Sequence, residues 1–221
     1  MFSENNFVGP EYYYYLDKNG LLPDFFISVG KFSEDQIQFE LHRTGSMWKK
    51  REFPNNVEII RFDSHKDINL WKFISENSID LIIQGGVSFI FLSEMIKTVS
   101  LGVLNVHPGK LPEYRGCSAP EWAIYNGDDV YISAHMIDEG IDTGPIIEEQ
   151  FFDYTKFDSY ANFRANIYAE CANVLVTALK ILNDNNGFDV LTPQKDSNAR
   201  YFERINSNDL IIVQNKFSII L

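Results

Sequence analysis

Short apolar runs and amphipathic stretches alternate along the chain. Runs of strand length occur at residues 25–29, 57–60, 81–83, 103–106, 130–137 and 146–147. Helices are expected between and after them, at residues 10–20, after Asp67, at 93–97, at 118–127 and from 158 or 159 onward. Because strands and helices alternate, the sequence predicts an α/β fold with a largely parallel sheet.

Capping residues and glycines set the expected helix boundaries. Asp67 is expected to cap the helix that follows it, and Ser118 to cap a helix that closes at Gly127. The helix after residue 158 is the longest, and its apolar residues recur at three- and four-residue spacing. This stripe is expected to pack in the core or at a dimer contact.

Residues 31–53 differ from the rest because they carry mixed charge without a clear period. A loop is expected at residues 44–46. The basic stretch at 47–51 is short, so we expect a solvated and mobile surface there in preference to a phosphate site.

Polar side chains interrupt the apolar run at residues 103–106. Asn105 and His107 are two residues apart, so in a strand they point to the same side. Pro108 and Gly109 then end the strand. Ligands of open α/β sheets bind at the carboxyl ends of strands, although taken singly Asn105 could cap a turn and His107 could be a buried structural residue.

A second polar loop follows the strand at residues 130–137. It holds two Asp and two Gly residues between His135 and Pro145. Asp142 lies in this loop and, taken alone, could be an ordinary turn residue.

Together these segments resemble the folate-dependent formyltransferase family. The first motif is Asn-x-His-Pro-x-x-Leu-Pro-x-Tyr-Arg-Gly at residues 105–116, and the second is His-x-x-Asp-x-Gly-x-Asp-Thr-Gly-Pro at 135–145. The resemblance implies a Rossmann-like formyltransferase fold, a single catalytic domain over residues 1–221 and 10-formyltetrahydrofolate as cofactor. It also implies that Asn105, His107 and Asp142 are catalytic.

Formyl transfer to an amine passes through a tetrahedral intermediate, which gives these three residues roles. The Asn105 amide can donate to the developing oxyanion, a contribution of about 3 kcal/mol by analogy with other oxyanion donors. His107 can share that work. Asp142 can stabilise a charged imidazole or accept the proton through water, and His135 is expected to support the site.

The same resemblance places a second group of residues beside the folate pterin. These cofactor-binding residues are Gly86, Phe89, Ile90, Phe91, Asp138, Glu139 and Gly140. Glycines let backbone approach a flat ring closely, and carboxylates can match its donor-acceptor edge. The alternative is a plain turn at residues 85–86 with Phe89 and Phe91 in the core.

Composition limits the classes of partner and ligand that are expected. The formal net charge is −12, which opposes nucleic acid because binding to phosphate polymers depends on Lys and Arg. Cys117 and Cys171 have neither a pairing pattern nor metal-ligand spacing, so no metal is expected. No apolar run approaches the about 20 residues that cross a membrane. A cytoplasmic enzyme with a small-molecule substrate is expected.

The Tyr-Arg-Gly form of the first motif is more similar to the tRNA and sugar-nucleotide branches of the family. The acidic chain favours a nucleotide-linked 4-amino-4,6-dideoxy sugar as acceptor, with Lys110, Tyr114 and Arg115 as substrate-binding residues. Lys110 and Arg115 could equally form surface salt bridges. The alternatives are methionyl-tRNA, glycinamide ribonucleotide, or folate or nucleotide binding without catalysis.

The amino terminus departs from the family, in which a central strand comes first. Only Met1 and Phe2 precede the expected first loop, whereas residues 216–221 are apolar and strand-like. The sequence therefore predicts that this carboxyl-terminal segment fills the first-strand position, parallel to its neighbours.

Overall fold

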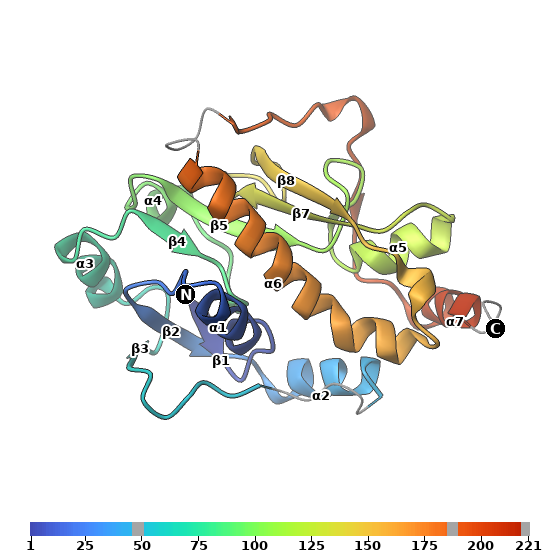
Figure 1. Ribbon diagram of the computed structural model, residues 1–221, viewed down its shortest axis with the longest axis horizontal. Coiled ribbons are helices and arrows are strands. Elements are labelled where there is room, and N and C mark those ends of the chain that lie inside the picture. Colours follow the sequence, from blue (N-terminus) through green and yellow to red (C-terminus); the bar gives the residue numbers. More distant parts are fainter. Residues whose placement is uncertain (46–50, 185–189, 218–221) are drawn as a thin grey trace.

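The computed structural model describes residues 1–45, 51–184 and 190–217. Two sheets lie edge to edge, one in the order β1-β2-β3 and the other in the order β4-β5-β7-β8, with a separate pair β6-β9 (Figure 1). The strands are β1 (Phe2–Glu4), β2 (Phe26–Lys31), β3 (Ile59–Phe62), β4 (Leu81–Ile83), β5 (Gly102–His107), β6 (Arg115–Gly116), β7 (Tyr131–Met136), β8 (Ile146–Phe151) and β9 (Tyr201–Phe202). All pairs are parallel except β5-β7 and β7-β8. The predicted α/β fold is confirmed.

Helices pack against the sheets. They are α1 (Gly9–Lys18), α2 (Glu34–Arg43), α3 (Ile68–Glu76), α4 (Ser93–Ile96), α5 (Ala119–Asn126), α6 (Tyr160–Asp184) and α7 (Ser207–Phe217), with 3-10 turns at Tyr154–Lys156 and Asp196–Asn198. Figure 1 shows α6 crossing one face of the sheet beside α1, where it contacts β5, β7 and β8. Among the described residues, α6 alone has the length and mean hydropathy of a membrane-spanning helix, but Phe163, Ile167 and Leu175 on it pack in the core.

The first strand is formed by the amino-terminal residues, so the prediction for the carboxyl-terminal segment is wrong. Phe2 of β1 pairs with Ser28 of β2. On the other side, the Met1 nitrogen donates to the Ile83 carbonyl at 2.8 Å, and the Gly85 N–H donates back to Met1 at 2.8 Å. These hydrogen bonds follow the parallel pattern and join the two sheets through the amino-terminal residues.

The carboxyl-terminal residues predicted to form that strand belong instead to α7. Lys216 and Phe217 end this helix, which packs against α5 and α6 and away from β1 (Figure 1). Phe217 is buried against the rings of Phe163 and Tyr160. The remaining predicted strand residues, 218–221, lie outside the described residues.

A cavity marks the amino end of the short β1. It has a volume of about 540 Å³ and lies between β2 and β4, lined by residues 25–27 and 81–83 and by tyrosines of α1. Pairing of β1 with β2 begins at Ser28, so Phe26 and Ile27 precede it. The cavity therefore lies beside the part of β2 that precedes its pairing with β1.

Residues 31–53 contain a helix that the sequence prediction missed. Helix α2 begins with a capping box, in which Ser33 Oγ accepts from the Gln36 N–H and the Gln36 side chain accepts from the Ser33 N–H. Most of the basic stretch, residues 47–50, lies outside the described residues. Arg51 is paired with Glu11 at 2.9 Å.

The other helix boundaries agree with the prediction, with one exception. Asp67 caps α3 by accepting from the Asn69 N–H, and α5 ends at Gly127 in a left-handed conformation with φ of 80°. Ser118 does not cap α5 with its side chain. Its hydroxyl accepts from the Ile205 N–H at 3.3 Å instead, which joins the start of α5 to the chain just before α7.

Candidate active site

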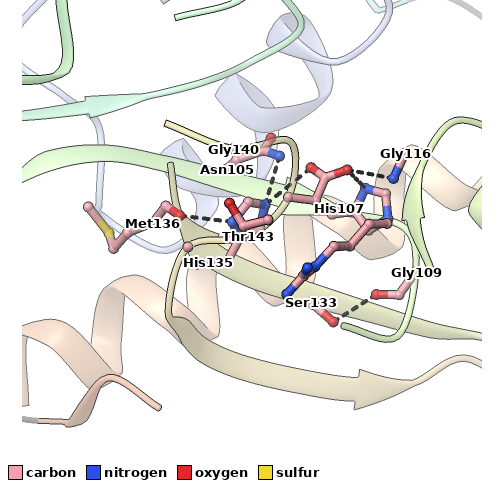
Figure 2. Close-up of polar contacts among 12 residues, drawn as sticks. Asn105, His107, Gly109, Gly116, Ser133, His135, Met136, Gly140 and Thr143 are labelled. Carbon is pink, nitrogen blue, oxygen red and sulfur yellow. Dashed lines mark hydrogen bonds and ion pairs between the residues drawn. The ribbon is translucent and has the colours of Figure 1, made fainter. Parts of the chain in front are cut away.

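The antiparallel pairing of β5 with β7 places four polar side chains on one face. Asn105 lies opposite His135, and His107 lies opposite Ser133. Figure 2 shows these side chains grouped at the end of β5, with the loop that follows β7 lying over them. Residues two apart on a strand share a face, so Asn105 and His107 point to the same side, as predicted, and the pairing adds His135 and Ser133 to them.

The contacts of His107 fix its tautomer. Its Nε2 lies 2.7 Å from the Tyr114 carbonyl oxygen, which can only accept, so Nε2 carries a proton. Its Nδ1 lies 3.5 Å from Asp142 Oδ2. Burial lowers the pKa of His107, assisted by His135, and outweighs the opposing effects of Asp142 and the Tyr114 carbonyl. The ring is therefore neutral at pH 7, with the lone pair of Nδ1 on the side of Asp142.

Asp142 joins the two motifs. Its Oδ2 accepts from the Gly116 N–H at 2.8 Å, and its Oδ1 lies 3.6 Å from His135 Nε2. Burial raises the pKa of the Asp142 carboxyl, but the neighbouring imidazoles of His107 and His135 and the Gly116 N–H outweigh it and hold the pKa well below its usual range. The arrangement is thus an ionised carboxylate beside a neutral imidazole.

His135 orients the amide of Asn105. The Nδ1 of His135 donates to the Met136 carbonyl at 2.9 Å, so in the neutral ring Nε2 accepts from Asn105 Nδ2 at 3.1 Å. One N–H of the amide is used in this contact, which leaves the other for an incoming oxygen. The contact supports the auxiliary role predicted for His135.

Gly109, within the first motif segment, and Gly144 of the second motif are required by close approach. A Cβ at Gly109 would lie 2.6 Å from His107 Nε2, and a Cβ at Gly144 would lie 1.9 Å from the Met136 carbonyl oxygen. Any side chain at these positions would displace His107 or the loop that carries Asp142. Close packing around His107 and beside Met136 therefore explains why glycine stands at these two positions.

The loop at residues 138–144 is held by its own side chains. Asp138 Oδ1 accepts from the Gly140 N–H at 3.1 Å and from the Thr143 hydroxyl. Glu139 is exposed and accepts from Ser93 Oγ of α4 at 2.6 Å. Two of the predicted cofactor carboxylates thus shape the loop, and Glu139 joins it to the end of the segment at residues 86–93.

The remaining predicted cofactor residues divide between surface and core. Gly86 has φ of 84°, and its carbonyl accepts from the Ser3 N–H at 2.8 Å. Phe89 stacks on His65 with ring centroids 4.6 Å apart, and Ile90 is 70% exposed. Phe91 is buried in the core, which is the alternative position considered for it. Phe91 is therefore not brought to a ligand surface.

The structure does not bring two of the three predicted substrate residues to a free surface. Tyr114 is buried, stacks on Phe202 and donates its hydroxyl to Asp128. Arg115 is also buried, and its guanidinium donates to Gln194 and Asp196. Lys110 is partly exposed, with its Nζ 3.5 Å from Glu113 Oε1. Only Lys110 is placed to meet a ligand from solvent.

Gln194 was missed by sequence reasoning. Its Nε2 donates to the carbonyls of Asp142 at 2.9 Å and Gly144 at 2.7 Å. It lies 50 residues after Gly144 within a polar stretch, and no local pattern distinguishes it from its neighbours. Within the described ranges, His, Cys, Asp and Glu side chains form no group of three placed to hold a metal ion.

Comparison with known sequences identifies relatives of the segment that carries both motifs. A family model described as formyl transferase matches residues 46–179. The chain is 29% identical to a methionyl-tRNA formyltransferase of Kosmotoga olearia over 136 residues, which are 61% of this chain and 43% of that protein. The corresponding enzyme of Microcystis aeruginosa is 26% identical over 148 residues, 66% of this chain and 45% of that protein. The chain thus spans less than half the length of these curated relatives.

Solved structures with the same fold include a transformylase and a formyltransferase bound to a sugar nucleotide. Glycinamide ribonucleotide transformylase 1 from Symbiobacterium toebii superposes with a TM-score of 0.60 at 18% identity, covering 88% of this chain and 92% of that one. The formyltransferase PseJ from Anoxybacillus kamchatkensis, in complex with UDP-4,6-dideoxy-4-formamido-L-AltNAc and tetrahydrofolate, gives 0.55 at 17% identity, with 80% and 85% covered. At these identities the likeness concerns the fold.

Proposed function

Because the chain belongs to the formyl transferase family, we propose that it transfers a formyl group from 10-formyltetrahydrofolate to the amine of a nucleotide-linked 4-amino-4,6-dideoxy sugar. The observation that carries the chemistry is the group formed by Asn105, His107 and Asp142 at the carboxyl end of β5. It offers an amide donor, a neutral imidazole and an ionised carboxylate within one small space.

Each residue has a step that its contacts support. 10-Formyltetrahydrofolate supplies the formyl group when bound. The acceptor amine forms a bond to the formyl carbon, and Asn105 Nδ2 donates its second N–H to the oxygen that becomes negative. His107 Nδ1 holds a lone pair and accepts the proton from the attacking nitrogen, while Asp142 at 3.5 Å stabilises the imidazolium.

Collapse of the tetrahedral intermediate completes the reaction. The bond between the formyl carbon and the folate N10 breaks, and the proton held on His107 passes to that nitrogen. The products are the formamide of the sugar and tetrahydrofolate. The formyl group has moved from folate N10 to the sugar amine, and a proton has moved from the amine to N10.

We propose that two loops beside this group hold the flat ring of the folate. The Ser93–Glu139 hydrogen bond joins the segment at residues 86–93 to the loop at 138–144. Ile90 and Ile141, one on each segment, are exposed, and exposed apolar side chains at a site favour a ring system as ligand. Of the residues assigned from the resemblance, we propose that Gly86, Phe89, Ile90, Asp138, Glu139 and Gly140 line the cofactor site.

The acceptor is proposed from charge and from structural likeness. The net charge of −12 is unfavourable for tRNA, and PseJ has been solved with a formamido sugar nucleotide. Lys110 is proposed as a phosphate contact; Tyr114 and Arg115 are not, because both are buried. The rival acceptor is methionyl-tRNA, which the names of the curated relatives favour. A cytoplasmic location and a homodimer are further proposals, tested by cell fractionation and by light scattering.

A panel of acceptors tests the proposal. Purified protein with 10-formyltetrahydrofolate is offered dTDP-4-amino-4,6-dideoxyglucose, methionyl-tRNA or glycinamide ribonucleotide, and tetrahydrofolate release and the acceptor's mass are measured. Turnover of the sugar nucleotide alone is the expected result, and Asn105→Ala should abolish most of it. Turnover confined to another acceptor would assign that branch. Folate binding without turnover on any amine would indicate a binding protein.

A further inference from the structure

The loop that carries Asp142 is held from outside by the segment at residues 192–202, which we call the strap. Thr192 of the strap bridges Ile146 of β8 by a pair of backbone hydrogen bonds of 2.8 and 2.9 Å. Two residues later, Gln194 Nε2 donates to the carbonyls of both Asp142 and Gly144. One amide thus restrains the main chain on both sides of Thr143.

Arg115 fixes the other end of the Gln194 side chain. Its Nε and Nη2 donate to Gln194 Oε1 at 3.0 and 2.8 Å, and Nη2 also contacts exposed Asp196 Oδ1 at 3.1 Å. Both N–H bonds of the Gln194 carboxamide and its oxygen are therefore engaged. Gln194 has a single orientation in which its N–H groups face the loop.

Arg115 and Gly116 act on the same residue by different routes. The N–H groups of Arg115 and Cys117 donate to the strap carbonyls of Arg200 and Phe202, which leaves the Gly116 N–H on the opposite side of β6. That N–H donates to the Asp142 carboxylate. The dipeptide thus holds the Asp142 side chain directly through Gly116, and its main chain through Arg115 and Gln194.

Asp142 needs such restraint because its backbone is in a left-handed conformation. Its φ is 54°, a region that L side chains rarely adopt unless the surroundings impose it. Without Gln194, the carbonyls of Asp142 and Gly144 lose the donor that they share. The main chain that carries the carboxylate between His107 and His135 is then restrained only by the contacts of Gly116 and Asp138 and by the rest of the loop.

We propose that Gln194, oriented by Arg115, is a positioning residue that places the Asp142 carboxylate for proton transfer. The inference deepens the proposed function and rests on it for its kinetic consequences, but the placement itself is a property of the folded protein. Gln194 lies outside residues 46–179, so the proposal concerns a part of the chain that the family match does not include.

Two substitutions separate the contacts of Gln194. Gln194→Ala removes both its contacts, whereas Gln194→Glu keeps an acceptor for Arg115 but presents oxygen, not N–H, to the two carbonyls. We expect each to lower kcat by about 10- to 100-fold, the range for residues that orient a reactive group, with little change in KM. Gln150→Ala removes a partly buried amide on β8 that contacts Glu148, and is the matched control.

A double-mutant cycle distinguishes positioning from a general loss of structure. If Gln194 acts through Asp142, Gln194→Glu should lower kcat much less in the Asp142→Asn background than in the wild type, because the group it places is already neutral. A full and additive loss in that background, or an unchanged kcat in both Gln194 variants, would overturn the proposal.

A measurement that needs no substrate keeps this test separate from the proposed function. The imidazole of His107 is titrated by NMR in the wild type, Gln194→Glu and Asp142→Asn. Asp142 raises the pKa of His107, so Asp142→Asn should lower it, and Gln194→Ala, which adds no charge, should shift it in the same direction and is titrated as well. A His107 titration that moves only in Asp142→Asn would show that Gln194 does not place the carboxylate, whatever the protein formylates. If Gln194→Ala fails to fold, Gln194→Glu and Arg115→Lys supply the same comparison.

Discussion

Gly116 and Asp142 are joined by a hydrogen bond of 2.8 Å, in which the last residue of the first motif donates its N–H to the carboxylate of the second. The two motifs are therefore parts of one structure. The bond also accounts for the conformation of Gly116, which has φ of 95° and lies where a Cβ would approach the Phe202 carbonyl oxygen at 2.3 Å. A change at either end should disturb both motifs.

Asp142→Asn removes a charge while keeping nearly the same shape. We expect kcat to fall by about 10²- to 10³-fold, the range for a group that assists proton transfer, with folate affinity little altered. Steady-state kinetics and folate binding by fluorescence check this. Asp17→Asn, on the exposed end of α1, is the control and should leave both unchanged. Equal losses of turnover and of affinity would identify Asp142 as a structural loop residue.

The pH dependence of the reaction follows from His107. Burial holds its pKa below the ordinary value of 6.5, and as a base it acts only when neutral. The rate should therefore rise as the pH passes upward through a value below 6.5 and then stay level, since Asp142 is ionised throughout this range. Asp142→Asn should move this acid limb to lower pH, because the carboxylate raises the pKa of His107. An acid limb above pH 6.5 would exclude His107 as the base.

Substitutions of Asn105 test whether its side-chain amide donates to the developing oxyanion. Asn105→Ala should lower kcat by about 10²- to 10³-fold, as expected for the loss of one oxyanion donor. Asn105→Asp fills the same space but puts a negative charge beside the developing oxyanion, so it should be at least as slow. Rates of single turnover at saturating folate provide the measurement. Restoration of activity in Asn105→Asp would contradict the role as donor.

The part of the site predicted from sequence is the part determined by strand geometry. Asn105 and His107 share a face because they are two apart on β5, and Asp142 follows the adjacent strand β7. The contacts of Gln194 and Arg115 depend on how the strap returns to β6, which no local spacing encodes. Sequence reasoning therefore predicted which side chains the strands bring together, and missed both Gln194 and the contact by which Arg115 orients it.

Tertiary contacts explain the missed helix α2. Its mixed charges gave no clear period because Glu40 and Arg43 face a buried ionic cluster. Arg43 lies 3.8 Å from Glu121 of α5, and Arg164 of α6 lies 3.7 Å from Glu40. Tyr160 and Tyr168 donate to Glu121 and Glu40 at 2.9 Å. Polar residues thus face the interior here, contrary to the pattern that predicts an amphipathic helix.

The carboxyl-terminal helix provides a prediction about stability. Phe217 is 1% exposed and packs against Phe163, Tyr160 and Tyr154, whereas Ile212 on the same helix is 45% exposed. Phe217→Ala should lower the free energy of unfolding by about 3–5 kcal/mol, since it leaves a cavity among these rings. Ile212→Ala should change it by no more than about 0.5 kcal/mol. Urea denaturation followed by circular dichroism measures both. Phe217→Ala should keep its activity in the absence of denaturant, because α7 contributes none of the side chains around Asp142. Equal effects of the two substitutions on the free energy of unfolding would show that α7 does not pack on α6 as described.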